Sequence, residues 1–261
     1  MAVDLAYQFT ISKAALHKVP TQERKFLLVA SHCLNEVCML QKLLAMQTNC
    51  LAQHEPEQSL QAQQAMLLLR LLAGKIVEAW NTTSHWFGPI APAIEPSLER
   101  ETIAGLVRLR HYFADSSNLL RTTRDRFAFH NSTDAIETEF DALPEDSSFR
   151  AVVGSASGNT FMGFADEAAG YALLRMADAD SPQQALEFFL DKVTSVSADF
   201  VRFVTDSVGF ILGRHASETF RMIEENKIDL SRQPRLNEVH LPFLFRNPAA
   251  PDSQVSRDQP S

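Results

Sequence analysis

Three arginines and one histidine lie close together in the stretch 119–131, and their types suit phosphate chemistry. An arginine side chain can hold a phosphate through two hydrogen bonds and stays charged at any relevant pH. A histidine titrates near neutral pH and can therefore give or take a proton. Arg121, Arg124, Arg126 and His130 together predict chemistry on a phosphodiester. That chemistry needs no metal if the 2′-hydroxyl of an RNA is the nucleophile.

The spacing leaves open which arginine would act with the histidine. Arg124 and His130 are six positions apart, so on an ideal helix their side chains diverge by about 120°. They converge only if the helix ends or bends near Phe129. Arg126 precedes His130 by four positions and would share its face directly.

The run from Arg124 to Asn131 resembles the signature of HEPN domains. In that signature an arginine, usually followed by a polar residue, precedes a histidine by four to six intervening positions. Here Asp125 follows Arg124, and His130 comes after five intervening residues rather than the commonest four. The resemblance covers the helices from about 21 to 131. It implies an up-and-down helical bundle, which in many members is a metal-independent ribonuclease whose site is shared by two chains.

Carried onto this sequence, the resemblance assigns catalysis to Arg124 and His130, and substrate binding to Arg121, Arg126 and Asn131. It implies no metal and no cofactor. The partners it implies are RNA, a second copy of the chain forming a homodimer, and an antitoxin-like protein. The corresponding function is an endoribonuclease of a toxin–antitoxin or phage-defence type.

The alternative is a non-catalytic helical protein that serves interaction or dimerisation, since other members of that family lack activity. In this interpretation the Arg-rich stretch is a solvated helix end. Its cations would satisfy the last carbonyls and the helix dipole, and Asp125 would neutralise them. The ribonuclease hypothesis predicts that His130 and an arginine point into one cleft. The interaction hypothesis predicts that His130 is buried and that its arginine is bound to Asp125 or Glu36.

The charge distribution excludes a generic DNA-coating protein. The chain has 261 residues and a formal net charge of −8, whereas such proteins are basic. Between 100 and 130, however, six arginines face only three acids, which makes a local positive patch. Residues 131–148 are polar and acidic by contrast, and we expect a linker or loop there.

The three cysteines, Cys33, Cys38 and Cys50, are odd in number and lack Cys-x-x-Cys spacing. They predict free thiols in a reducing compartment rather than disulfides or a zinc site. His32 and Glu36 lie four apart, but without a further ligand they are a weak metal pair. We see no signal peptide and no apolar run approaching about 18 residues, so we expect a cytoplasmic protein without a membrane segment.

Hydrophobic spacing and a low glycine content predict a mainly α fold. We expect an up-and-down helical bundle with a small β-hairpin insertion and a long C-terminal helix. The expected helices are at about 21–48, 58–86, 97–120, 165–176 and 182–226. Ser97 is expected to cap the third helix, and residues 115–118 either interrupt it or open a fourth. Residues 149–153 and 160–164 flank a Gly/Ser-rich turn and should form the hairpin.

This pattern suggests a HEPN-like bundle over 1–131, a hairpin with C-terminal helices packing on it over 132–245, and a disordered tail over 246–261. Gly209 and Gly213 either kink the last helix or allow another helix to approach closely. The phenylalanine stripe between 188 and 212 indicates core or a dimer seam. Trp80, His85 and Trp86 either complete the core or stack a base.

Overall fold

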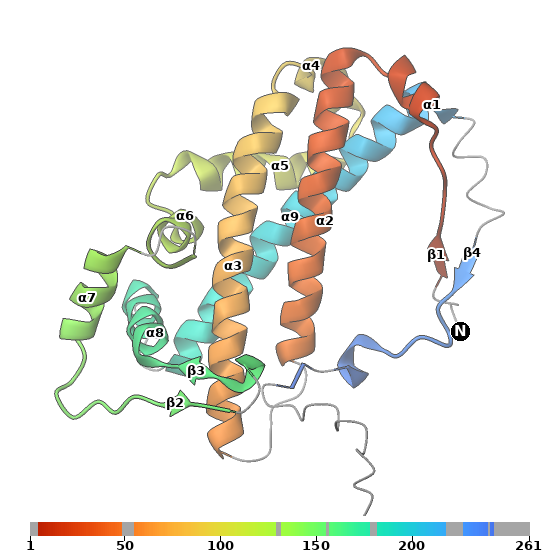
Figure 1. Ribbon diagram of the computed structural model, residues 1–261. Helices are drawn as coiled ribbons and strands as arrows, with labels where there is room; N and C mark the ends of the chain where they lie inside the picture. The colour runs from red at the N-terminus through yellow and green to blue at the C-terminus, as the bar shows by residue number, and fades with distance from the viewer. Residues whose placement is uncertain are drawn as a thin grey trace, which may run out of the picture.

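The fold is organised around two long antiparallel helices that lie side by side (Figure 1). They are α2 (Thr21–Thr48) and α3 (Glu55–Phe87), which confirms the helices expected at 21–48 and 58–86. A third long helix, α9 (Pro182–His215), crosses behind both. The computed structural model describes residues 5–48, 55–128, 132–154, 157–177, 182–217, 227–239 and 241–242. The tail expected to be disordered, 246–261, lies outside them.

Shorter elements surround this frame, and the chain is mainly helical as expected. Residues 115–118 separate α5 from α6, so the fourth-helix alternative is confirmed. The remaining elements are β1 (Leu5–Tyr7), α1 (Lys13–Lys18), α4 (Ala91–Ile94), η1 (Glu95–Ser97), α5 (Arg100–Ala114), α6 (Leu119–Thr123), η2 (Arg124–Ala128), α7 (Thr133–Asp141), β2 (Ala151–Val152), η3 (Ser157–Asn159), β3 (Phe161–Met162), α8 (Phe164–Met176), β4 (Lys227–Asp229) and η5 (Leu236–Glu238).

One hydrophobic core joins α2, α3, α5 and α9. Phe203 of α9 lies at its centre, with ring centroids 4.8 Å from Phe87 and 6.1 Å from Phe26. Trp80 of α3 is buried and stacks on Phe113 of α5 at 5.3 Å. Phe189, Phe200 and Phe203 of the α9 stripe are therefore core, whereas Phe188 is exposed, and Trp80 belongs to the core rather than to a base-stacking surface.

The expected β-hairpin is present. Strands β2 and β3 pair antiparallel, with Ala151 opposite Met162 and Val152 opposite Phe161. A second pair, β1 with β4, was not expected, because the residues near 227 carry no clear strand signal in the sequence. These three-residue strands are far apart in the chain and stand beside the bundle (Figure 1).

Two local expectations were wrong. Residues 133–141, expected to be loop, form α7, and its Glu139 is buried in an ion pair with Arg175 of α8. Ser97 does not cap the third helix, which begins at Arg100. Instead, Asp206 of α9 accepts a hydrogen bond from the backbone N–H of Glu99 at 3.0 Å, so a tertiary contact satisfies this end.

The C-terminal end of α9 also differs from expectation. Between α3 and α5, residues 91–97 form two short helical turns. Helix α9 ends at His215, before the expected 226, where His215 Nε2 lies 2.8 Å from Oε2 of buried Glu23. Residues 218–226 lie outside the described part. None of the described helices is long and apolar enough to cross a membrane.

A close approach of two helices occurs at Gly105 of α5, and not at the glycines of α9. A Cβ at Gly105 would lie 2.9 Å from Oδ1 of Asp199, whereas one at Gly209 or Gly213 would meet nothing within 4 Å. Asp199 is buried and forms two hydrogen bonds with Arg108, at 2.8 and 2.6 Å. The missing side chain of Gly105 thus makes room for a buried carboxylate that links α9 to α5.

Replacing Gly105 with alanine is expected to destabilise the fold by about 1–3 kcal/mol, the usual cost of overpacking a filled site. The new methyl group meets a carboxylate that Arg108 holds in place. Denaturation in urea measures this change in the free energy of unfolding. The matched control is Gly209→Ala, which should stabilise by up to about 1 kcal/mol because alanine favours helix more than glycine does. Equal effects of the two substitutions would contradict the close contact.

Candidate functional site

The Arg-rich stretch folds as a short helix that widens into a π-helix. Asn118 caps α6, since its side chain accepts a hydrogen bond from the N–H of Arg121 at 3.0 Å. The π-helix η2 (Arg124–Ala128) follows, and the N–H of Ser132 then donates to the carbonyl of Arg126 at 3.2 Å. The helix therefore widens inside the motif, and Phe129, near which it was expected to end or bend, lies outside the described residues.

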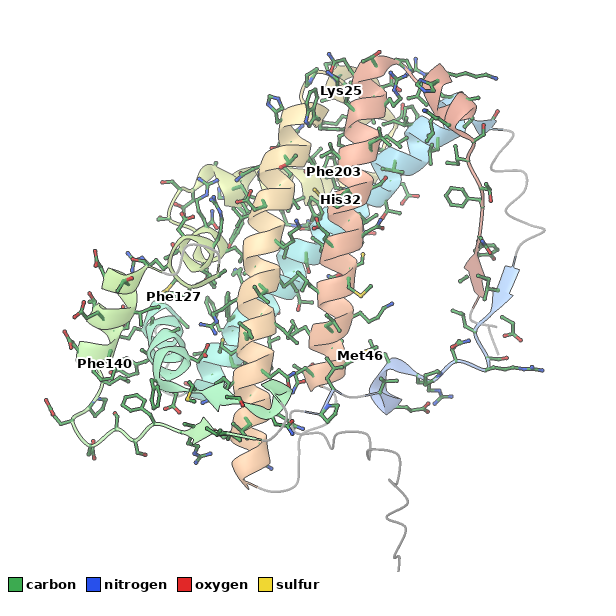
Figure 2. The ribbon with its side chains drawn as sticks, viewed as in Figure 1. Lys25, His32, Met46, Phe127, Phe140 and Phe203 are labelled. Carbon is green, nitrogen blue, oxygen red and sulfur yellow. The ribbon has the colours of Figure 1, made fainter. Side chains whose placement is uncertain are left out.

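His130 and Asn131, to which catalysis and substrate binding were assigned, lie outside the described residues. The pairing of His130 with either arginine stays a prediction. The rest of the stretch is well anchored. Phe127 is buried against Ala169 and Ala172 of α8, and Figure 2 shows its side chain between α6 and α8.

The anchoring extends to the start of α6. Leu120 is fully buried, and its backbone N–H donates to the hydroxyl of Tyr112 at 3.3 Å. Burial raises the pKa of Tyr112 to about 12, so this hydroxyl stays neutral at any physiological pH. The Arg-rich stretch is thus held in a fixed position against α3, α5 and α8.

Arg124, the arginine at the start of the motif, is bound to two carboxylates. Its Nε lies 2.7 Å from Oε1 of Glu78 on α3, and its Nη1 lies 3.2 Å from Oδ1 of Asp125. Arg126 is exposed and Arg121 is partly buried. Neither of these two lies within ion-pair distance of a carboxylate in the part of the chain that the structure describes. Sequence analysis did not single out Glu78, because its pairing with Arg124 depends on the packing of η2 against α3.

Glu78 also lines a groove of about 490 Å³ between α2 and α3. Leu28 and Val29 form part of its apolar wall. Its other polar or thiol groups are those of His32, Cys33, Glu36, Lys75 and Thr82. Figure 2 places His32 on α2, near the middle of this helix pair. Side chains from α2 and α3 come together in this groove. Glu78 connects the groove to Arg124 of the Arg-rich stretch.

The charged side chains that line the groove lie in ion pairs with neighbouring residues. Nζ of Lys75 lies 2.5 Å from Oε2 of Glu36, and Nε2 of His32 lies 3.5 Å from the same oxygen. Glu36 of α2 thus pairs with Lys75 of α3. Lys75 lies about one helical turn before Glu78, the residue that pairs with Arg124. The described residues contain no group of three or more His, Cys, Asp or Glu that could hold a metal ion.

The described cysteines are free, as expected, and Cys33 is buried at the groove. Burial is the main cause that raises the pKa of its thiol, while the nearby ammonium of Lys75 opposes this shift. Burial also raises the pKa of Cys38. A thiol with a raised pKa holds less thiolate near neutral pH and is a poor nucleophile. Cys33 is therefore expected to be a weak nucleophile in the native protein.

Comparisons with models of protein families, with curated proteins and with solved structures found no match. The resemblance to HEPN domains therefore rests on the motif between Arg124 and Asn131, and the family assignment stays a prediction.

The ion pair between Arg124 and Glu78 is expected to give a coupling of about 0.5–1 kcal/mol in a double-mutant cycle, because both groups are partly exposed. The cycle compares the free energy of unfolding of Arg124→Ala, Glu78→Ala and the double variant. A second cycle with Glu101→Ala, whose carboxylate lies 3.7 Å from Arg202, should give no coupling to Arg124. A coupling of zero in the first cycle would mean that Arg124 is not held by Glu78.

Alkylation of Cys33 by iodoacetamide is expected to be much slower than that of a free thiol near neutral pH. The raised pKa lowers the thiolate fraction, so the rate should continue to rise with pH beyond the usual thiol range. Mass spectrometry resolves the labelling of each cysteine, with the denatured protein as the control. Rapid labelling of Cys33 in the native protein at neutral pH would contradict this prediction.

Proposed function

We propose that this chain is a non-catalytic helical interaction protein. The observation that carries the proposal is the ion pairing of Arg124 with Glu78 and Asp125. An arginine that clamps a phosphate must direct its N–H donors to that phosphate. Two carboxylates of its own chain already lie within ion-pair distance of the guanidinium of Arg124, and together they more than offset its charge.

The surroundings of Arg124 do not favour an anionic substrate either. Lys75, the other permanent cation at the groove, is paired with Glu36. Three carboxylates (Glu36, Glu78 and Asp125) therefore lie beside two permanent cations (Lys75 and Arg124) in this region. A phosphate that enters it would have to displace one of these carboxylates from its cation. Electrostatic repulsion by the remaining carboxylates would oppose its binding.

Exposed apolar side chains on the outer face of α2 and α3 support an interaction role. Leu28 and Met39 are 53% and 55% exposed and lie eleven residues apart, which is about three helical turns, so they share one stripe of α2. By the same spacing Leu67, 44% exposed, shares a stripe of α3 with Glu78. These exposed apolar side chains flank the groove between the two helices and are available for contact with a partner.

A second candidate, the metal-independent endoribonuclease, is supported by the π-helix inside the motif. Single π-helical turns occur frequently at functional sites. The exposed Arg126 in this turn carries no ion pair to a described residue and would be the arginine available to a phosphate. In this second candidate His130 acts as acid or base beside Arg126.

Cleavage of a labelled mixed-sequence RNA in the presence of EDTA separates the two functions. We expect no cleavage by the wild type, because Arg124 is neutralised and the groove does not favour a phosphate. The variants are His130→Ala and Arg126→Ala, and His111→Ala, which removes an exposed histidine of α5, is the matched control.

Cleavage that survives EDTA, is kept by His111→Ala and is lost in His130→Ala would overturn the proposal and establish the ribonuclease. Cleavage that is equal in the wild type and all three variants would indicate a contaminating nuclease. Loss of cleavage in Arg126→Ala as well would identify Arg126 as the phosphate-binding arginine.

A further inference from the structure

A cluster of exposed apolar side chains lies on one face of the β-hairpin, away from the groove. Strand β2 is Ala151–Val152, and if the same extended alternation holds on either side of it, Phe149 and Val153 lie on the face of Ala151. Met162 pairs with Ala151 and lies on that same face. Phe164, two residues further along the chain, contacts Phe149 at a ring distance of 6.1 Å. The hairpin therefore presents a continuous apolar face.

Helix α7 extends this face with Phe140, which stacks on Phe149 at 5.5 Å. Figure 2 shows Phe140 on α7, at the side of the molecule away from α2. We call the set of Phe140, Phe149, Val153, Met162 and Phe164 the hairpin patch. Its members are not part of either buried core cluster, and four of them are largely exposed, at 48% for Phe140, 76% for Val153, 50% for Met162 and 48% for Phe164.

Acidic side chains border the hairpin patch. The segment 132–154 contains six acids and one arginine, and of these acids Glu139 is buried and paired with Arg175, so five acids remain for the surface. Glu137 lies three residues before Phe140 and shares its side of α7. Glu145 and Asp146 lie in the connection between Phe140 and Phe149, and both are exposed. An apolar centre with a polar rim is the usual anatomy of a protein-binding surface.

We propose that the hairpin patch binds a basic amphipathic segment of a protein partner, with apolar side chains seated on the aromatic cluster and Lys or Arg facing the acidic rim. Such a segment matches both the apolar centre and the sign of the rim. The sign disfavours two other occupants. RNA carries the same charge as the rim. A second copy would place one acidic rim against another, because a two-fold interface brings identical patches together.

The hairpin patch lies outside the α2–α3 groove. It adds to the proposed interaction function the chemical class of the partner, a basic amphipathic segment. Binding and RNA cleavage are measured separately, so the two proposals can fail independently. If the RNA is not cleaved and the patch binds nothing, the inference fails while the proposed function stands. Cleavage that depends on His130 overturns the proposed function whatever the patch binds.

Fluorescence anisotropy with a short labelled Lys/Leu amphipathic peptide and the full chain tests the inference. We expect binding that weakens as salt rises from about 0.1 M to about 1 M, because the Debye length falls from about 10 Å to about 3 Å. A Glu/Leu peptide of the same pattern should not bind. A Lys/Ser peptide, which keeps the charge and lacks the apolar face, should bind at least roughly tenfold more weakly.

Exposed positions provide matched variants that leave the core intact. Val153→Ser and Met162→Ser should each weaken binding of the Lys/Leu peptide, together by roughly tenfold or more. Val107→Ser, at a valine of α5 that is 56% exposed, should leave binding unchanged. Reversing a rim charge with Glu137→Lys should weaken binding and reduce its dependence on salt, whereas Asp191→Lys on α9 should do neither. Unchanged thermal unfolding shows that each variant is folded.

Three results would overturn the inference. The first is that the Lys/Leu peptide does not bind, or that the Lys/Ser peptide binds equally well. Equal binding would mean that electrostatic attraction alone accounts for the affinity. The second is binding that is insensitive to Val153→Ser and Met162→Ser together. The third is a dimer of the wild type, detected by light scattering, that dissociates in Met162→Ser, because a second copy would then cover the patch.

Discussion

The structure depends on burial of the aromatic stripe of α9 against the pair formed by α2 and α3. Phe189, Phe200 and Phe203 are almost fully buried, and full burial of each such side chain contributes about 1.5–3 kcal/mol. Phe203 contacts aromatic rings of both α2 and α3, so one side chain joins the three long helices. This packing uses the inner faces of α2 and α3. Their outer faces and the groove between them are left to the solvent.

Polar contacts at several positions along α9 then fix its position relative to α2 and α5. Asp206 caps α5, Asp199 is held by Arg108, and the side chain of Gln41 donates to the hydroxyl of Ser197 at 2.7 Å. At the end of α9, His215 contacts Glu23 of α2. A buried polar group that loses its partner costs free energy, so a shift of α9 along its axis would break several of these contacts together. The apolar stripe brings α9 to the core, and the polar contacts select one register.

The same packing separates the charges of the chain. The Arg-rich stretch is held between α3 and α8, where Arg124 meets Glu78, and Phe127 fills the space beside α8. The acidic segment that follows turns away from it as α7 and the hairpin. A positive region bound by its own carboxylates and a separate acidic surface with exposed aromatic rings therefore come from neighbouring parts of the sequence. This separation favours protein binding at the acidic surface over phosphate chemistry at the arginines.

The sequence by itself determined the elements whose signals are local. Regular apolar spacing defined α2 and α3 to within a few residues, and a Gly/Ser-rich turn between two short β-forming runs defined the hairpin. The tertiary structure decided the features that depend on distant partners. An acidic segment became α7, with Glu139 bound to Arg175; the close helix contact fell at Gly105; and Arg124 became bound to Glu78. Periodicity reports only which face of a helix is apolar. The rotation and register of packed helices decide which charges meet, and these are set by the whole core at once.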